Sequence, residues 1–284
     1  MNKLIKYSKF IALLFLIFLY GCNDFQNNSF NIVFGADTYS LGKNRIIFSA
    51  IENVDTNLNN DFRIEINNVD SNANSESFVI KPNFYTWPNK NTGFYAFDYV
   101  FKIQGEYKIN VYEFNNPEKS QIQTIFVKEN QTPVVGESMP LLDNKVISNK
   151  LDISEITSDP EPEINFYTYK FSEALNLNHP LIVFFLSPNF CKTATCFPQL
   201  EVLKRLQSQY DDKIIFIHVE VYENPHLIKG DLMNAEVSNV LDDWNINSEP
   251  YTFLINNKKL VSKFQGYVSY DEILKDIKKI INVD

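Results

Sequence analysis

The chain has 284 residues and carries 26 lysines and arginines against 35 aspartates and glutamates, which gives a formal net charge of -9. This acidic balance argues against a nucleic-acid-binding protein and against a basic membrane-binding face. The length is large for one hydrophobic core and sufficient for two domains.

The N-terminus combines basic side chains with a short apolar run. Lysines precede residues 10–20, which are apolar throughout and too few to span a bilayer as a helix. The run ends in "LYGC", which resembles a bacterial lipobox. This resemblance implies that residues 1–21 are a cleaved signal peptide and that Cys22 is diacylated, followed by a polar tether over residues 22–29. An uncleaved anchor with an incidental cysteine is the alternative.

Residues 30–130 show short strands separated by turn residues. The strands are expected where apolar, aromatic and β-branched residues cluster: 45–50, 62–66, 94–103, 106–114 and 120–129. This pattern is typical of an all-β sandwich. The stretch "GEYKINVYEF" resembles a strand of immunoglobulin-like folds, although the cysteine and tryptophan core signature of that family is absent. We expect a spacer or interaction module here, because no polar cluster indicates catalysis.

Residues 131–150 contain prolines and a glycine without clear periodicity, so they are predicted to be a linker. From residue 151 to 284 strands and helices alternate. The expected elements are, in order, a short helix within 169–180, a buried strand at 181–186, a helix at 198–210, a strand at 213–222, a helix at 231–244, a hairpin at 251–266 turning at Asn256-Asn257, and a last helix after a capping box of Ser269 and Glu272. This order predicts an α/β layer with antiparallel terminal strands.

Apolar spacing also predicts which side chains the helices bury. The helix at 198–210 is expected to pack Leu200, Leu203, Leu206 and Tyr210. The helix at 231–244 is expected to pack Met233, Val237, Val240 and Leu241.

Cys191 and Cys196 stand between the buried strand and the following helix. Once Cys22 is lipidated they are the remaining cysteines, and an extracytoplasmic compartment permits disulfides, so they are expected to meet. The element order and the segments "VFFLSPNFC", "CFPQLEVLKRL" and "SEPYTFLINNKKL" resemble the thioredoxin fold over residues 151–284. With the lipobox and the β-rich half, the chain resembles bacterial thioredoxin-like lipoproteins.

The resemblance implies roles for particular residues. Cys191 would be the exposed nucleophile and Cys196 the resolving thiol, whereas helix position alone would give the lower thiol pKa to Cys196. Phe190 stands where thioredoxins usually carry an aromatic residue. Glu249 and Pro250 stand where thioredoxins carry a cis peptide bond before proline. Phe190, Glu249 and Pro250 are therefore expected to contact the substrate.

The C-x4-C spacing departs from the C-x-x-C of thioredoxins. Within one continuous helix, side chains at i and i+5 diverge by about 140°. A disulfide needs Cα atoms about 4.4–6.8 Å apart. At least one cysteine is therefore expected outside the helix, which would begin between Thr195 and Phe197.

Three other chemistries compete with thiol–disulfide exchange. The pair could be a structural bridge in a redox-inert binding module. Copper handling would need a third soft ligand, for which His226 is the candidate, since His179 precedes a strand and His218 lies within one. Peroxide reduction is the third alternative. Peroxiredoxins carry P-x3-T-x2-C, whereas Pro188, Thr193 and Cys196 here form P-x4-T-x2-C.

The expected function is thiol–disulfide exchange by a membrane-anchored protein that faces outside the cytoplasm. Cys191 and Cys196 would carry the reaction, as in a thiol–disulfide oxidoreductase. Protein thiols or disulfides of the cell envelope would be its partners. We expect no cofactor, no metal site and no nucleic acid.

Overall fold

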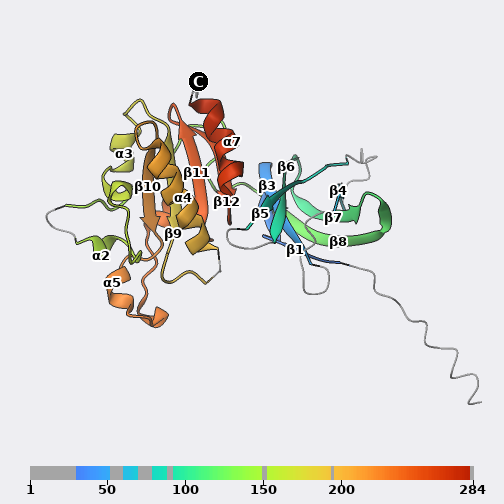
Figure 1. The fold of residues 1–284 in the computed structure, drawn as a ribbon, viewed down its shortest axis with the longest axis horizontal. Coiled ribbons are helices and arrows are strands. Elements are labelled where there is room, and N and C mark those ends of the chain that lie inside the picture. Colours follow the sequence, from blue (N-terminus) through green and yellow to red (C-terminus); the bar gives the residue numbers. More distant parts are fainter. Residues whose placement is uncertain are drawn as a thin grey trace, which may run out of the picture.

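The structure is a computed structural model that describes residues 30–51, 60–69, 79–87, 92–148, 152–192 and 195–281. The expected export signal and Cys22 lie outside these ranges. Figure 1 shows two units side by side, a β-rich unit and an α/β unit. No helix in the described ranges is both long enough and apolar enough to cross a membrane.

The β-rich unit consists of two four-stranded sheets. The first sheet has the order β1 (Asn31–Phe34), β3 (Gly42–Ile51), β6 (Gly93–Phe101), β5 (Asn83–Thr86). The second has the order β2 (Thr38–Ser40), β8 (Asn116–Lys128), β7 (Gly105–Glu113), β4 (Phe62–Asn68). All pairs are antiparallel except the parallel pair of β2 and β8. The five strands expected from the sequence are thus confirmed as β3, β4, β6, β7 and β8.

The two sheets enclose one apolar core. Side chains of β3 alternate between buried and half-buried, so Ile46 and Phe48 face the same side as expected for a strand. They share a cluster with Ile109 and Val111 of β7 in the other sheet. Phe48 stacks on Tyr95 of β6 with ring centroids 5.1 Å apart. Burial of each such side chain contributes about 1.5–3 kcal/mol of hydrophobic free energy.

The α/β unit is built on a mixed sheet. Its strand order is β10 (Ile215–Glu220), β9 (Leu181–Leu186), β11 (Tyr251–Asn256), β12 (Lys259–Gln265). β9 and β10 are parallel, whereas β11 runs antiparallel to both β9 and β12. The predicted parallel pair and the antiparallel terminal hairpin are both confirmed.

Helices cover both faces of this sheet, which explains the continuous apolar run of β9. Phe184 faces the cluster formed with α4 (Cys196–Tyr210) and α7 (Tyr270–Ile280). Phe185 faces the opposite cluster, which includes α3 (Phe171–Ala174). All six residues of β9 are buried, as expected for a strand covered on both faces.

The remaining helices of this unit are short. They are α2 (Ile153–Ile156), the 3₁₀-helix η2 (Ile164–Tyr167), α5 (Pro225–Ile228), the 3₁₀-helix η3 (Leu232–Asn234) and α6 (Val240–Asp243).

The helix expected at residues 231–244 is wrong. Only η3 and α6 form there, and Met233 is 93% exposed and Val237 62% exposed. Val237 instead forms an isolated bridge with Tyr222, and the N–H of Glu223 donates to the carbonyl of Glu236 at 2.7 Å. This extended pairing occupies backbone groups that a continuous helix would need.

Two other local expectations change in detail. The β-hairpin turns at Asn257 and Lys258, one residue later than expected, and both have positive φ angles (51° and 64°). Positive φ at both central residues suits the right-handed twist of a hairpin. The hydroxyl of Ser269 accepts from the N–H of Glu272 and caps α7, but the Glu272 carboxylate binds Arg45 of β3, so the reciprocal half of the capping box is absent.

The predicted linker packs on the α/β unit. The N–H of Gly136 donates to the carbonyl of Leu260 at 2.8 Å, and Met139 and Leu142 are buried. The two units also meet directly, because Phe94 and Ala96 of β6 belong to the same apolar cluster as α4 and α7.

Candidate functional site

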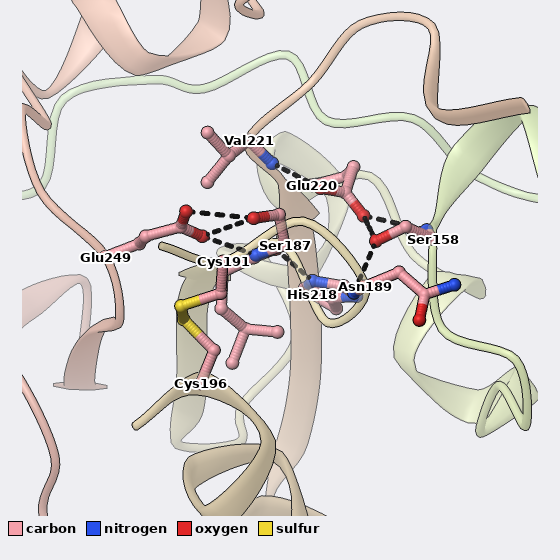
Figure 2. Close-up of a disulfide and its surroundings, with 10 residues drawn as sticks. Ser158, Ser187, Asn189, Cys191, Cys196, His218, Glu220, Val221 and Glu249 are labelled. Atoms are coloured by element: carbon pink, nitrogen blue, oxygen red, sulfur yellow. Dashed lines mark hydrogen bonds between the residues drawn. A yellow bond between two sulfur atoms is a disulfide. The ribbon is translucent and has the colours of Figure 1, made fainter. Parts of the chain in front are cut away.

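Cys191 and Cys196 form a disulfide at the carboxyl end of β9, with Cα atoms 6.1 Å apart (Figure 2). Cys196 is the first residue of α4 and is fully buried, whereas Cys191 is half-buried in the preceding loop. The expectation that one cysteine lies outside the helix is confirmed, and the helix begins within the expected Thr195 to Phe197 window. One sulfur is therefore closer to solvent than the other.

The turn before the disulfide is closed by hydrogen bonds to Ser187. The carbonyl of this residue accepts from the N–H of Cys191 at 3.0 Å and from the N–H of Phe190 at 3.2 Å. These bonds hold the chain in a tight turn directly after the buried strand β9. The backbone of Cys191 is therefore held at the carboxyl end of β9 by this turn, and its side chain is tied to α4 through the disulfide with Cys196.

Glu249 lies beside this turn although it is far away in the sequence. The N–H of Ser187 donates to Glu249 Oε2 at 2.6 Å, and the hydroxyl donates to Oε1 at 2.9 Å and Oε2 at 2.7 Å. Ser187 itself is fully buried. Burial raises the pKa of the Glu249 carboxyl above its ordinary value, while the Ser187 hydrogen bonds and the charge of Lys192 oppose the rise.

The Glu249 carboxylate also approaches the disulfide. One carboxylate oxygen and the sulfur atoms of Cys191 and Cys196 all lie within 4.8 Å of one another. Figure 2 shows the carboxylate facing Ser187 and lying near the disulfide. The structure thus brings three of the sequence-predicted site residues together.

Phe190 and Pro250 flank this group. Phe190 is half-buried and packs edge-on against Tyr222, with ring centroids 6.0 Å apart. The Glu249–Pro250 peptide bond is cis, as the resemblance implied. The carbonyl of Pro250 accepts from the N–H of Gly266 at 2.8 Å, so one of its lone pairs is already used within the hairpin. No described contact tests the expected role of Phe190 or Pro250 in substrate binding.

A second buried carboxylate lies at the end of the neighbouring strand β10. Glu220 Oε2 accepts from the N–H of Ser158 at 2.8 Å and from its hydroxyl at 2.7 Å, and Oε1 accepts from the N–H of Val221 at 3.0 Å. The Ser158 hydroxyl oxygen also accepts from the N–H of Asn189 in the cysteine loop at 3.3 Å. Burial raises the pKa of Glu220 to about 7, against these hydrogen bonds.

His218 is a buried core residue with a hydrogen-bond partner on each ring nitrogen. Its Nδ1 lies 2.7 Å from the Tyr167 hydroxyl, and its Nε2 lies 2.9 Å from the carbonyl of Leu186. Because a carbonyl only accepts, Nε2 carries the proton and Nδ1 accepts from Tyr167. Burial lowers the pKa of His218 to about 4, so the ring is neutral near pH 7.

The other histidines do not join the cysteines. His179 and His226 are exposed, and the one group of three or more potential metal-binding side chains found among the described residues is Cys191, Cys196 and Glu249. The copper alternative therefore loses its histidine ligand within this part of the chain. The peroxidase alternative depends partly on Thr193, and this residue lies outside the described residues.

Ser187, Glu220 and Ser158 were not expected at this site from the sequence. A usable signal was present for the first two, because each stands at the carboxyl end of a predicted strand of a parallel pair. Ligands of open α/β sheets bind outside the carboxyl ends of the strands. Ser158 carried no such signal, since it lies in a loop after α2 and reaches the site only through the tertiary fold.

No protein-family model and no curated protein matches this chain. Solved structures with partial similarity include a malarial protein, at 20% identity over 37% of this chain and 99% of that chain, with a TM-score of 0.27. A filamin domain of Lin-41 matches at 12% identity over 35% of this chain and 93% of that chain, with a TM-score of 0.25. A yeast mitochondrial 1-Cys peroxiredoxin matches at 19% identity over 38% of this chain and 86% of that chain, with a TM-score of 0.27. Similarities of this size do not assign the chain to a family.

Proposed function

We propose that the protein is a thiol–disulfide exchange protein that acts through Cys191 and Cys196. The observation that carries the proposal is the asymmetry of the disulfide. Cys191 is half-buried in a loop at the sheet edge, and its partner Cys196 is fully buried at the start of α4. An exchange partner needs access to one sulfur, while the other sulfur leaves or resolves the mixed disulfide.

A thioredoxin-like fold for the α/β unit is part of this proposal. Its support is the strand order β10-β9-β11-β12, with a parallel pair joined through α4 and a terminal antiparallel hairpin followed by α7. An immunoglobulin-like sandwich is the corresponding proposal for the β-rich unit, supported by two facing four-stranded sheets around one core. The β-rich unit would hold the α/β unit away from the membrane.

The roles follow from accessibility. In the reduced protein the Cys191 thiolate attacks a partner disulfide, one partner sulfur leaves as a thiolate, and a mixed disulfide forms. The Cys196 thiolate then attacks Cys191, which releases the second partner thiolate and restores the bond between Cys191 and Cys196. The amides at the start of α4 favour the thiolate of Cys196 during this second step.

The location outside the cytoplasm is proposed from the lipobox-like "LYGC". A diacylated Cys22 would hold the protein on a membrane of the cell envelope, where its partners would be protein thiols or disulfides. Incorporation of a labelled fatty acid into the wild type, and its loss in Cys22→Ser, would support this anchor. Equal labelling of both proteins would contradict it.

The decisive experiment combines a reduction potential with trapping. We expect the pair to equilibrate above about -300 mV, the range below which structural bridges typically lie. Cys196→Ser should accumulate mixed disulfides with envelope proteins, because the resolving sulfur is gone. Cys191→Ser is the matched control and should trap far fewer. A potential well below that range together with no trapped partner would favour a redox-inert binding module with a structural disulfide.

A further inference from the structure

We propose that the reduced dithiol and Glu249 form a zinc site, with Cys191 Sγ, Cys196 Sγ and one Glu249 carboxylate oxygen as ligands and a fourth position open to water. This inference goes beyond thiol–disulfide exchange and does not depend on it. It requires only that the disulfide can be reduced.

The three donor atoms are already gathered in the oxidised protein. The two sulfurs and the carboxylate oxygen lie within 4.8 Å of one another. In a tetrahedral zinc site with Zn–S distances of about 2.3 Å and Zn–O distances of about 2.0–2.2 Å, neighbouring donors lie about 3.5–3.8 Å apart. Once reduction removes the bond between the sulfurs, small side-chain movements bring the three donors to these separations. The ligand oxygen comes from the loop that precedes β11, so the site would tie that loop to the cysteine loop.

Ser187 supplies the support that a metal-binding carboxylate requires. Its N–H and its hydroxyl both donate to the Glu249 carboxylate, and Ser187 is fully buried. A carboxylate has about four lone-pair sites, so these bonds leave room for a metal on the side that faces the sulfurs. Ligating carboxylates are typically hydrogen-bonded in this way, which fixes their orientation.

The donor set favours zinc among the common metals. Thiolate sulfur and carboxylate oxygen are both normal zinc ligands, and three protein ligands with one open position are typical of zinc sites that keep a water. The carboxylate disfavours copper(I), which prefers soft ligands, and the two thiolates disfavour calcium and magnesium, which prefer oxygen ligands. Cys191 and Glu249 are half-buried, so the fourth position is accessible to water.

The local charge is compatible with a dication. Two thiolates and one carboxylate carry three negative charges, so the site with Zn²⁺ would have a net charge of about -1. Lys192 is exposed and lies close enough to influence Glu249 electrostatically. Its flexible ammonium group balances that remaining charge at the rim of the site without acting as a ligand.

Formation of the site consumes a reductant and releases protons. A water-soluble phosphine gives two electrons to the disulfide and takes an oxygen atom from water to become the phosphine oxide. The two protons of that water go to the two sulfurs. Zinc then displaces both protons as it binds the two thiolates.

The test titrates Zn²⁺ into the full chain carrying Cys22→Ser, so that no third thiol is present, before and after phosphine reduction. We expect one equivalent of zinc to bind the reduced protein in competition with a chromophoric chelator, and none to bind the oxidised protein. Cobalt(II) should give thiolate charge-transfer absorption only in the reduced protein. Comparison of the two redox states of one chain does not depend on whether a variant folds.

Variants locate the ligands. Glu249→Gln and Ser187→Ala should weaken zinc binding at least tenfold, in line with the effects of losing a ligand or its orienting partner. Glu201→Gln is the matched control, since it makes the same change at an exposed carboxylate of α4 that is not among the three donors, and its zinc affinity should equal that of the parent chain.

Two results would overturn the site: reduced protein that binds no zinc, or an affinity that Glu249→Gln leaves unchanged. Neither result bears on exchange, because the titration uses no partner protein. Conversely, a chain whose reduction potential lies well within the range of structural bridges and that traps no partner, but that binds zinc after reduction, would overturn the exchange function and retain the zinc site.

Discussion

Glu220 and His218 stand two residues apart on β10. Burial raises the pKa of Glu220 and lowers the pKa of His218, and the two shifts change stability with pH in opposite directions. The native state holds the Glu220 proton more tightly than the unfolded chain does, so its contribution to stability is lost as the pH rises through about 7. The native state keeps His218 neutral, so its contribution is lost as the pH falls from about 6.5 towards about 4. The two dependences oppose each other where these windows overlap.

We predict that in Glu220→Gln the pH dependence of stability due to His218 is no longer opposed by that of Glu220. Glutamine does not ionise, whereas the wild type loses stability as Glu220 ionises. Between pH 4.5 and pH 8 the free energy of unfolding of the variant should therefore rise relative to that of the wild type by about 3 kcal/mol. Urea unfolding at these two pH values measures the gain. Glu223→Gln, which removes an exposed carboxylate nearby, controls for the loss of a negative charge. A difference between variant and wild type that is the same at both pH values would contradict the prediction.

At the scale of elements, the segment after β10 shows how local pattern and tertiary pairing compete. Residues 231–244 have apolar spacing that suits one helix, yet they form η3 and α6 with a short non-helical stretch between them. The Asn224 side chain accepts from the N–H of Glu236 at 3.0 Å and donates to the carbonyl of Asn234 at 2.9 Å. These bonds and the bridge between Tyr222 and Val237 satisfy the backbone without a helix.

We predict that two substitutions within this segment differ strongly in their effect on the free energy of unfolding. Met233→Gln should change the free energy of unfolding by less than about 0.5 kcal/mol, because the side chain is exposed. Leu241→Ala should cost about 2–5 kcal/mol, because it leaves a cavity in the cluster that contains Trp244. Denaturant midpoints measured on the two variants give the comparison. A substantial loss of stability in Met233→Gln would indicate that a packed helix forms in solution.

At the scale of the whole molecule, the ion pair between Arg45 and Glu272 joins the two units. Arg45 of β3 binds the Glu272 carboxylate of α7 through Nε at 2.5 Å and Nη2 at 2.7 Å. Its guanidinium also donates to the carbonyls of Tyr267 and Gln265. The two charged side chains are only 5% and 11% exposed. Since removal of one partner strands a buried charge, this pair should matter more than an exposed one.

We predict that Arg45→Met costs about 3–5 kcal/mol of unfolding free energy, because Glu272 and two carbonyls lose their donor. Lys43→Gln is the matched control on the same strand. Lys43 pairs with Asp98 on the surface, where both side chains are about half exposed, and its loss should cost under about 1 kcal/mol. Urea unfolding of both variants tests the difference, and similar costs would argue that the units do not depend on this contact.

Much of the fold was predictable because its signals are local. The buried strand β9 and the helix α4 follow from the apolar run and the helical spacing of Leu200, Leu203 and Leu206, and all of these residues are buried. The cysteine pairing was expected because Cys191 and Cys196 are the cysteines that remain once Cys22 is lipidated, and the disulfide is present. Strands β1, β2 and β5 were not placed individually, since each has only three or four residues and little periodicity.

The sequence by itself determined the longer strands, the helices α4 and α7 and where the cysteines stand relative to them, because period and turn chemistry act over a few residues. Only the tertiary structure decided that Glu249 meets Ser187 and the disulfide. β11 pairs antiparallel with β9 in a register that sets Tyr251 opposite Phe185, and this register carries Glu249 to the level of Ser187 at the sheet edge. Such a register depends on the packing of both sheet faces, which the pattern of either strand alone does not contain.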